Sequence, residues 1–235
     1  MSARQTIQLR ETVSGPSPGA APVATVIVLH GLGTDGRDFA PLVKELDLSR
    51  VGPVRFVFPN APQRTVSVNG GETLPAWYDP RPVAPVTGAL STQDEEGLRA
   101  SQEVVQALID REAARGVHSE QVVLLGFSQG AVMTLMAGLR APQRLAGLVV
   151  LSGYLPLPAA VHAEVSAANR DVPIFMAHGD QDMVVVPERA KASRDTLIDL
   201  GYDIAWHPYP MAHEVCPQEI RDLNSWLASL LAPWH

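Results

Sequence analysis

Apolar residues along this chain gather in short, nearly continuous runs separated by longer amphipathic stretches. The runs are rich in β-branched residues, which is typical of strands buried on both faces of a sheet. Six strands are predicted in this way, at residues 25–29, 54–58, 122–125, 148–151, 174–177 and 204–206.

Between these runs, apolar residues recur at spacings of three and four, which predicts helices. The expected helices cover residues 92–115, 131–139, 190–200 and 219–231. In the first of them, Leu98, Val105 and Leu108 share one face. Strands that alternate with helices predict an α/β fold with a mostly parallel sheet and helices on both faces.

Two stretches depart from the alternation. Residues 1–22 suggest a lead strand at 6–9 followed by a linker of Gly, Pro, Ser and Ala. Residues 60–90 contain many prolines and a hairpin signal that turns at Asn69-Gly70-Gly71. So long a loop is often functional, although it could be a surface excursion only. We expect one domain over 1–235, with the 60–90 excursion covering the active site.

Composition narrows the class of protein. The 235 residues are 46% hydrophobic, enough for a full core. A net charge of −7 without any cluster of Lys and Arg argues against a nucleic-acid partner. The single cysteine, Cys216, excludes an internal disulfide and fits a reducing compartment. No secretory signal and no apolar run of about 18 residues is visible, so we expect a soluble, cytoplasmic protein without stable membrane insertion.

The strongest chemical signal is Gly126-Phe127-Ser128-Gln129-Gly130, directly after a predicted strand and before a predicted helix. This is the context of a nucleophile elbow, in which a tight turn holds the serine hydroxyl out at the top of the sheet. Glycines on either side of the serine leave room where a Cβ would collide. Ser128 is therefore the expected nucleophile.

A serine nucleophile needs a base and a carboxylate that orients the base, in the chain order Ser, Asp or Glu, His. The loop after strand 174–177 offers Asp180 and Asp182. We favour Asp182, because Asp180 beside Gly179 is suited to shaping the turn.

Seven histidines compete for the role of base, and His213 is favoured because it lies on a loop between the last predicted strand and the last helix. The others are expected to be structural (His207), solvated (His118, His162, His235), or engaged in packing and hydrogen bonds near the site (His30, His178).

A glycine-rich loop, 30–36, follows the first long strand. Its backbone can approach a ligand closely, and we expect the N–H groups of Leu32 and Gln129 to form the oxyanion hole. The loop lacks the residues of a phosphate-binding motif.

Taken together, these segments resemble a bacterial carboxylesterase of the phospholipase/carboxylesterase family, the group that includes the acyl-protein thioesterases. The matching segments are LHGLGTDG (29–36), FPNAP (58–62), AWYD (76–79), GFSQG (126–130), HGDQD (178–182) with Val186-Pro187, and MAHE (211–214). The resemblance implies an α/β-hydrolase fold, the triad Ser128, Asp182 and His213, and oxyanion positions Leu32 and Gln129, and it is compatible with a homodimer. Ala131 and Met183 depart from the residues common in the family.

The leading hypothesis is a serine esterase that cleaves carboxylic esters of short to medium acyl chains and needs no cofactor or metal. An acyl-protein thioesterase or lysophospholipase is the alternative, since only the leaving group differs. A non-catalytic hydrolase-fold binding protein is more distant, because nucleophile, acid and base are all present. Leu74, Trp77 and Met183 are expected to line the acyl pocket.

Overall fold

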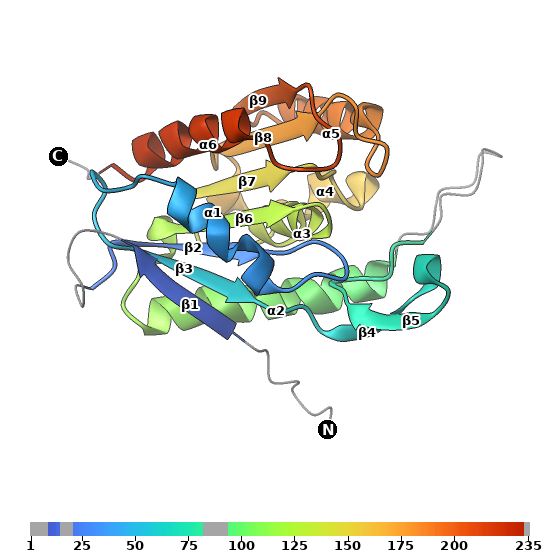
Figure 1. The fold of residues 1–235 in the computed structure, drawn as a ribbon, viewed down its shortest axis with the longest axis horizontal. Helices are drawn as coiled ribbons and strands as arrows, with labels where there is room; N and C mark the ends of the chain where they lie inside the picture. The colour runs from blue at the N-terminus through green and yellow to red at the C-terminus, as the bar shows by residue number, and fades with distance from the viewer. Residues whose placement is uncertain (1–8, 15–20, 82–93, 233–235) are drawn as a thin grey trace.

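The computed structural model describes residues 9–14, 21–81 and 94–232. Parts of the expected lead strand (6–8), of the linker (15–20) and of the excursion (82–90) lie outside these ranges. A seven-stranded sheet forms the centre of the fold, in the order β1-β3-β2-β6-β7-β8-β9 (Figure 1). The strands are β1 (Leu9–Ser14), β2 (Ala24–Leu29), β3 (Val54–Pro59), β6 (Val122–Phe127), β7 (Gly147–Leu151), β8 (Ile174–Gly179) and β9 (Ile204–Tyr209). All neighbours are parallel except β1, which pairs antiparallel with β3. The mostly parallel sheet is thus confirmed.

Helices cover both faces of this sheet. The four expected helices are present as α2 (Glu95–Ala114), α3 (Gln129–Gly138), α5 (Pro187–Asp199) and α6 (Pro217–Leu230). Two short helices were not expected: α1 (Ala40–Glu45) and α4 (Pro158–Glu164). Six or seven residues give too little apolar periodicity to separate such helices from loops.

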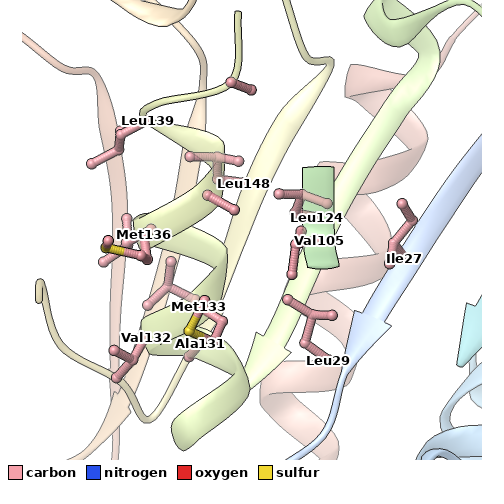
Figure 2. Packing of buried hydrophobic residues seen from close by; sticks show 14 of the residues in the cluster. Ile27, Leu29, Val105, Leu124, Ala131, Val132, Met133, Met136, Leu139 and Leu148 are labelled. Atoms are coloured by element: carbon pink, nitrogen blue, oxygen red, sulfur yellow. The ribbon is translucent and has the colours of Figure 1, made fainter. Parts of the chain in front are cut away.

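Alternate residues of β2, β3 and β6–β9 enter two separate cores. On one face, Ile27 and Leu29 of β2 and Leu124 of β6 pack with α2 and α3 (Figure 2), and the same core includes residues of α4 and α5. On the other face, Val26 and Val28 of β2 pack with α1 and α6. Burial on both faces explains why the strands read as continuous apolar runs.

The predicted hairpin in the excursion is confirmed. Strand β4 (Gln63–Val66) pairs antiparallel with β5 (Glu72–Pro75). The two strands are connected by a short 3-10 helix (Ser67–Asn69) and then by Gly70 and Gly71, whose φ angles are +67° and +84°. Glycine takes such angles without a steric penalty.

Parallel strands place their carboxyl ends at one edge of the sheet. The segments that follow β2, β6, β8 and β9 therefore meet there, and these segments carry the candidate site residues. Among the helices of the described ranges, none is long and apolar enough to cross a membrane.

Candidate active site

Ser128 occupies a strained turn between β6 and α3. Its φ of 55° and ψ of −117° lie in a region that a non-glycine residue rarely adopts. A Cβ on Gly126 would collide with the backbone of Gly130, and a Cβ on Gly130 would collide with the carbonyl of Leu29. Gly126 is therefore required by the tightness of the turn, and Gly130 by the close approach of the end of β2. Strain of this kind concentrates at functional sites.

The structure brings Ser128, His213 and Asp182 into one hydrogen-bonded chain. His213 Nε2 lies 2.9 Å from Ser128 Oγ, and His213 Nδ1 lies 2.7 Å from Asp182 Oδ2. Because an ionised carboxylate only accepts, Nδ1 carries the proton and Nε2 is free to accept the serine proton. The Phe127 ring packs against the imidazole, with ring centroids 4.9 Å apart.

Asp182 is almost completely buried, at 1% exposure, and is held by its own loop. Its Oδ1 accepts the backbone N–H groups of Val184 and Val185, at 2.8 and 2.9 Å. Asp180, by contrast, is exposed, and its backbone N–H donates to the Tyr209 carbonyl. The geometry therefore places Asp182, and not Asp180, opposite His213.

His178 contacts the same loop that carries Asp182. Its Nε2 donates to the Val185 carbonyl at 2.7 Å and lies 3.4 Å from Asp182 Oδ2. Burial lowers the pKa of His178, which keeps the ring neutral at pH 7. The expectation that this histidine serves hydrogen bonding near the site is confirmed.

The glycine-rich loop after β2 lies directly against Ser128. A Cβ built on Gly31 would sit 3.5 Å from Ser128 Cβ. The His30 ring links this loop to the segment after β3: Nδ1 donates to the Gly31 carbonyl at 2.7 Å, and Nε2 accepts the Ala61 N–H at 2.9 Å. Burial lowers the pKa of His30, consistent with a neutral ring.

Leu32 and Gln129 belong to the two segments that flank Ser128. Leu32 is next to Gly31 and is half-buried. Gln129 is the first residue of α3, where backbone N–H groups have no partner within the helix. Both residues are therefore close to Ser128 along the chain or in the neighbouring loop, and their role as oxyanion donors is a proposal.

Trp77 does not line an acyl pocket as expected. Its side chain has no exposed surface, and its indole Nε1 donates to the His30 carbonyl at 3.0 Å. We predicted from the sequence that its apolar face would be available to a substrate, but that face is covered by core residues. Trp77 therefore lies behind the catalytic loops and offers no surface to a substrate.

Leu74 and Met183 remain accessible. Leu74 is half-buried, and its Cδ1 would lie 3.9 Å from a Cβ on Gly33. Met183 is 86% exposed on the loop that follows Asp182. Their contact with an acyl chain is still a prediction.

Two further residues singled out in the sequence have clear structural surroundings. Ala131 departs from the residue common in the family that the sequence resembles. Its methyl group is accommodated because the facing Gly153 has no side chain. Cys216 is half-buried and caps α6, with the Glu219 N–H 3.5 Å from its Sγ.

Comparisons with known proteins point to one family. The sequence profile of the family described as Phospholipase/Carboxylesterase matches residues 12–231. An acyl-protein thioesterase 1 from Gibberella zeae is 39% identical over 215 residues, covering 89% of this chain and 92% of that protein. A probable carboxylesterase from Oryza sativa is 34% identical over 221 residues, covering 92% and 82%.

Among solved structures, an acyl-protein thioesterase 2 from Zea mays superposes with a TM-score of 0.79 at 28% identity, covering 94% of this chain and 99% of that one. The expected family and the α/β-hydrolase fold are thereby confirmed. The expectation of a bacterial protein is not supported, because the sequence relatives reported above are fungal and plant proteins.

Proposed function

This chain belongs to the phospholipase/carboxylesterase family of hydrolases, and from that premise we propose that it cleaves acyl esters through an acyl-enzyme on Ser128. The observation that carries the proposal is the unbroken chain of hydrogen bonds from Asp182 through His213 to Ser128. A scaffold without activity would have no need to keep the strained serine in register with a histidine and a buried carboxylate.

In the proposed cycle, Ser128 Oγ attacks the carbonyl carbon of the ester while His213 Nε2 takes the hydroxyl proton. The negative charge on the carbonyl oxygen is stabilised by the backbone N–H groups of Leu32 and Gln129. His213 then donates its proton to the leaving alcohol, which leaves an acyl-enzyme. Water, deprotonated by the same imidazole, attacks the acyl-enzyme; the imidazolium then returns this proton to Ser128 Oγ as the carboxylic acid leaves.

Asp182 acts on the base and not on the substrate. Its carboxylate holds the Nδ1–H tautomer of His213 and stabilises the imidazolium formed during each proton transfer. Because Asp182 is buried and already accepts two backbone N–H groups, its position does not depend on substrate binding.

The substrate class has two candidates. Carboxylic esters of short to medium acyl chains are the first, in line with the rice relative named a probable carboxylesterase. Acyl thioesters on proteins are the second, favoured by the 39% identity with a fungal acyl-protein thioesterase. The same triad serves both, because an alcohol and a thiol differ only as leaving groups.

The deciding experiment compares the two substrates on one enzyme preparation. Values of kcat/KM are measured for p-nitrophenyl esters from acetate to decanoate and for a peptide carrying a palmitoyl thioester on cysteine. A higher value for the esters, with an optimum at or below octanoate, supports the carboxylesterase assignment. A higher value for the palmitoyl peptide supports the thioesterase assignment, and no turnover of either contradicts the proposed function.

A further inference from the structure

Trp77 connects the excursion to the glycine-rich loop. Its buried indole donates to the carbonyl of His30, the residue that begins this loop, and its ring packs on the His30 ring with centroids 5.5 Å apart. A few residues earlier, the Pro75 carbonyl accepts the Gly33 N–H at 2.9 Å. The segment 75–78, called the brace below, therefore holds the loop on both sides of Leu32.

The side chain of Gln129 connects the same brace to the nucleophile elbow. Its Oε1 accepts the Trp77 backbone N–H at 2.6 Å, and its Nε2 donates to the Tyr78 carbonyl at 2.8 Å. Both bonds are buried, and the residue is 4% exposed. Buried hydrogen bonds without competing water hold geometry more firmly than exposed ones.

The brace is itself anchored to the rest of the fold. The Trp77 carbonyl accepts a hydrogen bond from Ser101 Oγ on α2. The Tyr78 hydroxyl lies 2.7 Å from the Tyr154 hydroxyl, after β7. The brace is thus fixed to α2 and to the segment after β7. It is also hydrogen-bonded to the glycine-rich loop and to Gln129 at the start of α3, the two segments next to Ser128.

We propose that Trp77 and the Gln129 side chain are positioning residues that set the oxyanion hole. This inference rests on the proposed function, in which the Leu32 and Gln129 N–H groups stabilise the oxyanion. These two groups belong to segments far apart in the sequence, and the brace is bonded to both. An oxyanion donor must lie about 2.7–3.1 Å from the developing charge, so a small shift of either segment weakens transition-state binding.

The first test is Trp77→Phe, which removes the indole N–H and keeps an aromatic ring. We expect kcat to fall about 10- to 100-fold, since misplacement by about 1 Å costs on the order of 100-fold. KM should change by less than about threefold, because the lost interaction acts in the transition state. The Ki of an arylboronic acid, which forms a tetrahedral adduct with the serine, should rise by a similar factor.

The matched control is Trp226→Phe. Trp226 lies on α6, packs against Phe175 with ring centroids 5.7 Å apart, and would contact a Cβ on Gly147 at the start of β7, the opposite edge of the sheet. Trp226→Phe removes the same side-chain volume as Trp77→Phe, so it measures the effect of a smaller ring alone. We expect its kcat and its boronate Ki to remain within about twofold of the wild type, a change too small to reflect a lost transition-state contact.

If Trp77→Phe does not fold, Gln129→Met replaces it, because methionine keeps the length of the side chain while removing both hydrogen bonds. Thermal unfolding accompanies every assay, and kcat is expressed per folded, titrated active site. A purely structural role would lower the unfolding temperature and leave kcat per active site and the boronate Ki unchanged, which would overturn the inference alone. A wild type that hydrolyses no ester or thioester would overturn the proposed function as well.

Discussion

Asp182 and His213 are joined by a 2.7 Å hydrogen bond between Oδ2 and Nδ1, made from a carboxylate whose other oxygen is already occupied. The N–H groups of Val184 and Val185 fix the rotation of that carboxylate. The imidazole is thus oriented by a group that is itself oriented by its backbone.

Asp182→Asn should therefore lower kcat by about three to four orders of magnitude, because an amide in this position favours the wrong imidazole tautomer. Asp180→Asn is the matched control two residues away, on an exposed side chain. It should keep most of the wild-type kcat. Steady-state kinetics on one ester decide the matter, and the reverse ranking would mean that the acid has been misassigned.

Leu74→Ala should change the acyl-chain preference. If Leu74 forms a wall of the acyl site, each acyl methylene that loses its contact costs up to about 0.8 kcal/mol, or about fourfold in kcat/KM. The preference for octanoate over butyrate should then shrink. Val68→Ala, an exposed residue on the same hairpin, is the control and should leave the preference unchanged. An unchanged chain-length optimum together with lower stability in Leu74→Ala would mean that Leu74 is structural.

Glu219 should make the stability of the fold depend on pH. The side chain is completely buried, and burial raises its pKa from 4.5 to about 8. Between these values the unfolded chain releases the proton while the folded chain keeps it, so the free energy of unfolding falls as pH rises from 4.5 to about 8.

Glu219→Gln removes the titrating carboxyl group. The free energy of unfolding at pH 8.5 should therefore exceed that of the wild type by roughly 2–5 kcal/mol, and the two proteins should differ little at about pH 4.5. Urea unfolding at the two pH values measures the effect. Glu214→Gln, an exposed residue before the same helix, serves as the control. Equal stabilities of Glu219→Gln and wild type at pH 8.5 would show that Glu219 is ionised in the folded protein.

The main strands and the candidate triad could be predicted because each follows from a short local pattern in the sequence. Buried parallel strands appear as continuous apolar runs, and the elbow is a five-residue motif whose glycines are required by close backbone contacts, within the turn at Gly126 and with the end of β2 at Gly130. The acid and base follow strands that end at the same edge as Ser128, which a parallel sheet guarantees.

The position of Trp77 could not be predicted in this way. Its partners, His30 and Gln129, lie 47 and 52 residues away along the chain, and one of the bonds runs to a backbone carbonyl that no side-chain pattern reveals. An apolar residue in a proline-rich loop looks the same in sequence whether it faces a substrate or the core. The lead strand shows a related difficulty: the prediction placed it at 6–9, whereas the described residues pair with β3 over Leu9–Ser14, a pairing that no local pattern in the sequence reveals.

The most direct test of the account is the labelling of Ser128 by a fluorophosphonate, read by peptide mass spectrometry alongside ester turnover. The wild type should be labelled at one site, on Ser128, and lose activity in proportion. Ser128→Ala should remain folded, resist labelling, and turn over ester several orders of magnitude more slowly, while Ser225→Ala, an exposed serine on α6, should behave as the wild type. A label on another residue, or more than about a tenth of wild-type turnover in folded Ser128→Ala, would contradict the account.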